Sequence, residues 1–87
     1  MIKGKTKSGF EYEISKARLE NYELIEALNE VDENPLLLPA TVNLLLGKEQ
    51  ASKLKEHLRD EEGLVSTEKL TNEIMGIFQS QKETKNS

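Results

Sequence analysis

The most apolar stretch of the chain lies between Asn34 and Gly47, where the sequence reads NPLLLPATVNLLLG. Asn34 is a favoured N-cap residue, Pro35 suits the first helical position, and Gly47 can adopt the left-handed conformation that ends a helix. A second proline, Pro39, lacks the N–H that a regular first turn requires. The pattern predicts a short turn before Pro39 and a helix over residues 39–46, around which the other elements are organised.

Alternation of apolar and polar residues marks residues 2–14 as a β-hairpin. Phe10, Tyr12 and Ile14 alternate with glutamates, which is the period of a strand with one buried face. The sequence Lys-Ser-Gly at residues 7–9 supplies the turn back to a weaker first strand. Because an isolated hairpin is marginal in water, we expect its aromatic face to rest on helices.

Helical spacing predicts three further helices. The first is capped by Ser15 and runs over residues 16–33. Its apolar face consists of Ala17, Leu24, Leu28 and Val31, flanked by Tyr22 and Ile25. The second follows the leucine-rich helix and ends in the acidic turn at residues 60–63.

The last predicted helix is capped by Ser66 and carries a regular apolar stripe. That stripe consists of Leu70, Ile74, Ile77 and Phe78. Gly76 either weakens the middle of this helix or lets another backbone approach closely. Residues 79–87 have nothing to bury and are predicted to form a flexible tail. We therefore predict a mainly α (α+β) fold over residues 1–78, in which the hairpin packs on a cluster of about four short helices.

The composition is that of an ordinary soluble globular protein, since the 87 residues are 36% hydrophobic and 32% charged. A chain this small buries a modest share of its surface, so a homo-oligomer or a larger assembly is expected. There are no cysteines, which excludes disulfides and suits the cytoplasm. Residues 1–9 lack the apolar core of a signal peptide, and no apolar run approaches the roughly 20 residues of a membrane helix. We predict no membrane association.

The net charge of −4 is unevenly distributed along the chain. Residues 1–9 carry three lysines and no acid, whereas residues 10–33 carry eight acids against Lys16 and Arg18. This distribution lacks the concentrated basic face that nucleic-acid binding requires, so we predict no nucleic-acid partner. The acids on the first long helix form either a solvated face or a surface for a basic partner.

No arrangement of residues points to catalysis, a cofactor or a metal. His57 is the single histidine, there is no cysteine, and no Gly-rich phosphate loop is present. His57 falls on a charged helix face and is predicted to face solvent. The serines have no base at motif spacing, and residues 60–63 lack the alternating ligands of a calcium loop. The chain is therefore predicted to be a binding protein and not an enzyme.

The leucine-rich segment carries more apolar side chains than one face of a short helix can bury. They are Leu36, Leu37, Leu38, Val42, Leu44, Leu45 and Leu46. Either this helix is central and covered on all sides, or part of the row forms a patch for a partner's helix. The candidate partner-binding residues are Leu36, Leu37, Leu38, Val42, Leu44 and Leu45, together with Glu23, Glu26 and Glu30 on the acidic helix.

The order of residues along the chain resembles that of a family of small phage and prophage proteins. The segments that carry this resemblance are SGFEYEI, NYELIEALNEVDENPLLLP and LLLGKEQASKLKEHLRDEEGLVSTEKLTNEIMGIF. The members of this family are tail assembly chaperones. They are encoded in prophages and long-tailed phages of Gram-positive bacteria, between the tail tube gene and the tape measure gene. The resemblance covers roughly residues 9–78 and includes no catalytic motif. Its most telling pieces are Asp32-Glu33-Asn34-Pro35, Leu45-Leu46-Gly47 with Glu49-Gln50, and Lys55-Glu56-His57-Leu58-Arg59 leading to Gly63.

The resemblance implies a non-enzymatic, largely helical protein of the bacterial host cytoplasm. Such a protein coats the tape measure protein, recruits tail tube subunits, and is absent from the mature virion. Two other classes remain open. A structural connector or minor particle component would be equally small and helical, but would be found in mature particles. A small regulator, such as an antitoxin or transcription factor, would require a basic recognition helix, whereas residues 48–59 mix both signs of charge.

Overall fold

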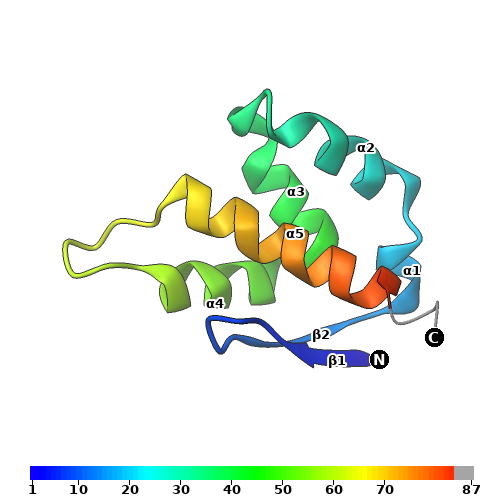
Figure 1. The fold of residues 1–87 in the computed structure, drawn as a ribbon, viewed down its shortest axis with the longest axis horizontal. Helices are drawn as coiled ribbons and strands as arrows, with labels where there is room; N and C mark the ends of the chain where they lie inside the picture. The colour runs from blue at the N-terminus through cyan, green and yellow to red at the C-terminus, as the bar shows by residue number, and fades with distance from the viewer. Residues whose placement is uncertain (84–87) are drawn as a thin grey trace.

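The computed structural model describes residues 1–83, with side chains through residue 81. Its elements are β1 (Ile2–Lys5), β2 (Glu11–Ile14), α1 (Lys16–Leu19), α2 (Tyr22–Val31), the 3₁₀ turn η1 (Pro35–Leu37), α3 (Leu38–Leu46), α4 (Lys48–Leu58) and α5 (Thr67–Glu83). Figure 1 shows the hairpin lying below the helices, and the loop between α4 and α5 extending away from the body of the molecule. The predicted mainly α (α+β) fold with an N-terminal hairpin is confirmed.

Asn21 divides the helix that was predicted to run without interruption over residues 16–33. Its backbone is extended, and its side-chain carbonyl accepts a hydrogen bond of 3.0 Å from the N–H of Glu23. This is the geometry of an N-cap, so the chain ends α1 and starts α2 in a new direction. The single long helix was therefore the wrong prediction.

Helix α3 lies at the centre of the fold, as the sequence indicated. It contacts α1, α2, η1, α4, α5 and β2. The predicted turn and helix are both present, with the Asn34 side chain capping the turn, although α3 begins one residue earlier than expected. Thr41 is fully buried on this helix, and its hydroxyl donates to the carbonyl of Leu37 at 2.8 Å. No polar side-chain atom buried within the described part of the chain lacks a hydrogen-bond partner.

Gly47 makes the sharp connection between α3 and α4. Its φ of +83° lies in the region that favours glycine. From α1, the Arg18 guanidinium donates through Nη1 to the carbonyls of Asn43 at 3.1 Å and Leu44 at 3.0 Å, at the end of α3. A Cβ atom on Gly47 would lie 3.2 Å from Nη2 of Arg18, so both the backbone conformation and the arginine cap favour glycine there.

One core joins the hairpin to the helices. Its buried apolar residues are Phe10, Tyr12, Ile14, Leu19, Leu24, Leu28, Val31, Leu38, Val42, Leu45, Leu46, Ala51, Leu54, Leu70, Ile74 and Ile77. The alternating face of β2 and the stripes predicted for α2 and α5 are confirmed, except that Phe78 is only half-buried.

The C-terminal helix covers the hairpin and is longer than predicted. Tyr12 lies across Gly4 of β1, where any Cβ would collide with its ring, and its hydroxyl accepts a hydrogen bond of 2.8 Å from Nε2 of Gln81. Because α5 continues to Glu83, the predicted tail boundary after residue 78 is wrong; residues 84–87 of that tail lie outside the described residues. Gly76 is exposed, and a Cβ atom placed on it would have no neighbouring atom within 4 Å, so of the two alternatives for Gly76 the close backbone approach is not formed.

Candidate protein-binding surface

Most of the leucine-rich segment belongs to the core. Leu38, Val42 and Leu45 are buried among the surrounding elements, so these three candidate partner-binding residues cannot reach another protein without unfolding. Leu37 and Leu44 are half-buried against the same core. The physical reason is the central position of α3, which has neighbours on almost every side. Of the six apolar candidates, Leu36 alone is exposed.

Leu36 is one of the large apolar side chains that the fold leaves exposed. Five large apolar side chains are exposed within the described residues, namely Met1, Tyr22, Ile25, Leu36 and Leu64. Three of them lie on the single segment formed by α2 and η1, where Tyr22 is 69%, Ile25 41% and Leu36 87% exposed. Sequence reasoning had placed Tyr22 and Ile25 beside the buried stripe. Helical geometry could have separated Tyr22, because it lies nearly half a turn, roughly 160°, away from Leu24.

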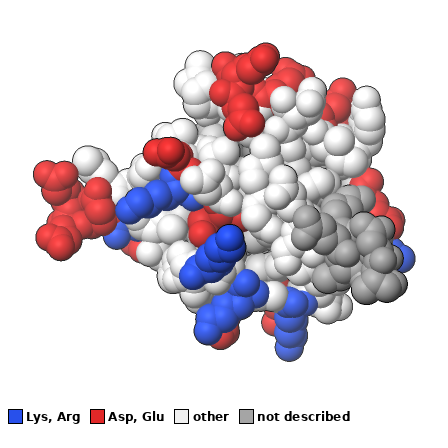
Figure 2. Space-filling model, viewed as in Figure 1, with Lys and Arg blue, Asp and Glu red and all other residues white. Residues whose placement is uncertain are grey.

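The acidic candidates lie on α2, the helix that also carries Tyr22 and Ile25. Glu23, Glu26 and Glu30 are all exposed, and no described basic side chain forms an ion pair with any of them. Figure 2 shows acidic side chains gathered along the upper edge of the molecule, where Figure 1 places α2 and η1. We call Tyr22, Ile25, Leu36, Glu23, Glu26 and Glu30 the α2–η1 surface. Its exposed apolar groups beside unpaired carboxylates are suited to an amphipathic partner with basic residues.

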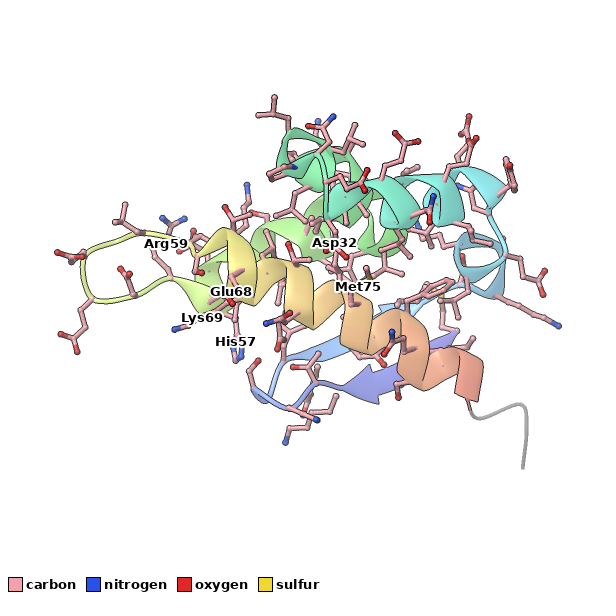
Figure 3. The ribbon with its side chains drawn as sticks, turned by 45° about the horizontal axis from the view of Figure 1, so that its top comes forward. Asp32, His57, Arg59, Glu68, Lys69 and Met75 are labelled. Atoms are coloured by element: carbon pink, nitrogen blue, oxygen red, sulfur yellow. The ribbon has the colours of Figure 1, made fainter. Side chains whose placement is uncertain are left out.

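His57 is exposed, as the sequence predicted, but it is not isolated. Its Nε2 lies 3.1 Å from both the hydroxyl and the carbonyl oxygen of Ser8 in the hairpin turn, and its ring is 5.6 Å from that of Phe10. Ser8 Oγ also donates to Oε1 of Glu73 at 2.9 Å. Figure 3 shows His57 reaching from α4 toward the hairpin. Because the carboxylate accepts from the serine and not from the imidazole, the relay order of a hydrolase triad is not formed. These contacts fasten the turn to α4 and α5.

No family model, curated protein or solved structure matches this chain. Its function is therefore inferred from its own residues and surface.

The acidic turn between α4 and α5 is held by its own hydrogen bonds. Oδ1 of Asp60 accepts from the N–H groups of Glu62 and Leu64, each at 2.9 Å, and these bonds, the Leu64 one first, hold the pKa of Asp60 below its ordinary value. Arg59 bonds the Gly63 carbonyl at 2.7 Å and pairs with Glu56 at 2.6 Å. Across residues 1–83 the acids and the histidine form no cluster of three that could hold a metal ion. None of the helices described has the length and apolar character needed to cross a bilayer.

Proposed function

We propose that this chain is a tail assembly chaperone of a long-tailed phage or prophage. In this role it binds the tape measure protein without catalysis, in the cytoplasm of the bacterial host, and recruits tail tube subunits. The resemblance in residue order supports the proposal. The structural observation that carries it is the almost complete exposure of Leu36 on η1, together with the exposure of Tyr22 and Ile25 on α2, on a segment whose carboxylates are unpaired within the described chain.

The chemistry of the α2–η1 surface suits a client that must be held and then released. Complete burial of a leucine or isoleucine side chain contributes about 1.5–3 kcal/mol, so three partly exposed apolar residues support a moderate, reversible affinity. The neighbouring carboxylates keep the unbound surface hydrated and favour clients that carry lysine or arginine beside their apolar stripe. Long amphipathic helices provide such stripes.

Co-expression with the tape measure protein tests both the function and the surface. We expect the wild-type chain to co-purify with its client and to keep the client in the soluble fraction. The double variant Tyr22→Ser/Leu36→Ser should lower the recovered complex by about tenfold, equivalent to a loss of about 1.4 kcal/mol. Leu64→Ser is the matched control, since Leu64 is 61% exposed but lies in the loop between α4 and α5.

The outcomes separate the function from the surface. If the wild-type chain neither solubilises nor co-purifies with the tape measure protein, the chaperone assignment is wrong. If the double variant performs as well as Leu64→Ser, the client binds elsewhere on the molecule. Mass spectrometry of mature particles addresses the alternative role, because a chaperone is absent from them whereas a structural connector is retained.

A further inference from the structure

The two long edges of the hairpin differ in whether other parts of the fold form hydrogen bonds with them. At the β2 edge, the Gln50 side chain accepts from the N–H of Glu13 at 2.7 Å and donates to its carbonyl at 2.6 Å. One amide side chain therefore pairs with Glu13 as the peptide group of a neighbouring strand would. At Glu13, α4 therefore covers the β2 edge.

The β1 edge has no such cover. Thr6 donates to the carbonyl of Phe10, and the strands are in register with Lys3 opposite Glu13 and Lys5 opposite Glu11. Since hydrogen-bonded and non-hydrogen-bonded pairs alternate, the N–H and C=O groups of Lys3 and Lys5 point outward, away from β2. Among residues 1–83, no group forms a hydrogen bond with these outward groups. They present the backbone pattern to which a further strand can add.

A cleft lies beside this edge. It has a volume of about 330 Å³ and opens between the end of β1 and helix α5, with Tyr12 and Ile77 among its apolar lining. Gly76 of α5 also lines it, and its lack of a side chain leaves that part of the cleft open. Small side chains from an added strand could enter there without displacing any described atom.

The charges around the edge indicate which kind of strand fits. Lys3, Lys5 and Lys7 are exposed, and their one ion pair within the described chain is a 3.9 Å contact between Lys3 and Glu13. Basic side chains gather along the lower edge of the molecule in Figure 2, where Figure 1 places the hairpin and α4. Pairing β1 with the β1 of a second copy would bring lysines against lysines, which is unfavourable. The β2 edge of a second copy is already occupied by Gln50 at Glu13.

We propose that the β1 edge is a docking site for an extended segment of another polypeptide with acidic residues at alternate positions. The segment adds as a third strand. Residues paired with Lys3 and Lys5 lie on the same outer face as these lysines and supply the carboxylates, while the residue between them is small or apolar and points toward the cleft. The lysines thus prevent self-pairing and select the partner. This site is separate from the α2–η1 surface and does not depend on the identity of the client bound there.

Peptide titration of the full ¹⁵N-labelled chain tests the proposal. The probe is an acetylated, amidated peptide of alternating glutamate and valine, and we expect it to shift and protect the amides of Lys3 and Lys5. The peptide is expected to add antiparallel to β1. Methylation of the glutamate backbone nitrogens should then abolish binding, because in an antiparallel pairing those N–H groups face β1 when the glutamates lie opposite the lysines. Methylation of the valine nitrogens is the matched control with the same charge, and it should preserve binding.

Variants of the protein provide the second arm. Lys3→Glu/Lys5→Glu should weaken binding by about tenfold or more, since it replaces two attractive cross-strand pairs by repulsive ones. Lys55→Glu/Lys69→Glu changes the net charge equally at exposed positions on α4 and α5, and should weaken binding by less than about threefold because salt screens it. The milder Lys3→Gln/Lys5→Gln guards against misfolding and should give an intermediate loss. No binding by the unmethylated peptide, equal binding by both methylated peptides, or equal losses in the two glutamate variants would overturn the proposal.

Discussion

At the scale of single residues, Leu45 and Leu36 show how differently the leucine-rich segment is used. Leu45 has no exposed surface, so Leu45→Ala should lower the free energy of unfolding by about 2–5 kcal/mol through lost burial and a residual cavity. Leu36→Ala should change it by no more than about 0.5 kcal/mol, since the side chain is 87% exposed. Urea denaturation at several protein concentrations measures both. A large loss for Leu36→Ala that grows with concentration would show that Leu36 is buried between copies.

The spacing of the apolar residues in this segment predicts which of them are buried, whereas their number alone does not. Leu38, Val42, Leu45 and Leu46 have the spacing i, i+4, i+7 and i+8, and these are the residues that the core buries. Leu36 precedes this stripe. What the spacing could not give is the number of elements that surround α3, and this decides how many further side chains are covered. For the same reason, the exposure of Ile25 emerged only from the structure.

At the scale of elements, Gln50 controls one edge of the hairpin. Gln50→Ala removes its bonds to Glu13 and its bond to the Leu46 carbonyl, and should cost about 1–3 kcal/mol of unfolding free energy at the roughly 1 kcal/mol typical of each bond. Amide exchange of Glu13 should accelerate in parallel. Gln50→Glu is the control, because its carboxylate can still accept from the Glu13 N–H while its donor is lost. The Glu13 amide should exchange more slowly in Gln50→Glu than in Gln50→Ala. Equal exchange rates in the two variants would contradict the role of Gln50 in covering the β2 edge at Glu13.

The turn between α4 and α5 should respond to acid through Asp60. Its pKa is lowered in the fold, so the stabilisation is present above its ordinary value of 3.8 and is lost as pH falls through the lower folded value. Asp60→Asn keeps a side-chain oxygen that can accept from the Glu62 and Leu64 N–H groups but cannot titrate. We expect the stability of the wild type, measured by thermal unfolding between pH 7 and pH 3, to fall more than that of the variant. Identical pH profiles would show that Asp60 contributes nothing.

Element ends were predictable wherever a capping residue stood at a clear change of pattern. Asn34 and Ser66 do so, and both side chains accept the expected backbone hydrogen bonds. Asn21 was missed because Ala17 falls on the same helical face as Leu24, Leu28 and Val31, so the apolar periodicity continues across the break. Local hydrogen bonding by an asparagine side chain outweighed that periodicity.

At the scale of the whole molecule, the contacts that join the hairpin to the helices were beyond the sequence. Ser8 meets His57 and Glu73 across 49 and 65 residues of chain, and Tyr12 meets Gln81 across 69. Periodicity indicates that the aromatic face of β2 must be covered, but not which helix covers it or where that helix crosses. The predicted tail boundary failed for this reason, since residues 79–83 contain no apolar residue and Gln81 makes a polar contact with the hairpin that the sequence pattern does not reveal.

A chain that ends at Phe78 tests this coupling between the two ends of the sequence. It lacks the Gln81 side chain and the last turn of α5, so it should lose at least about 1 kcal/mol of unfolding free energy. The bond from Gln81 helps to hold the Tyr12 ring over the backbone of Gly4. The rate of amide hydrogen exchange at Gly4 and Tyr12 should therefore rise in the shortened chain. Tyr12→Phe removes the acceptor while keeping the ring over Gly4. The truncated chain lacks the Gln81 donor, so Tyr12→Phe should lower its free energy of unfolding by less than it lowers that of the full chain. The difference between the two losses is the coupling energy of the Gln81–Tyr12 contact. Equal effects of Tyr12→Phe in both chains would mean that α5 stabilises the hairpin through its apolar residues before Gln79.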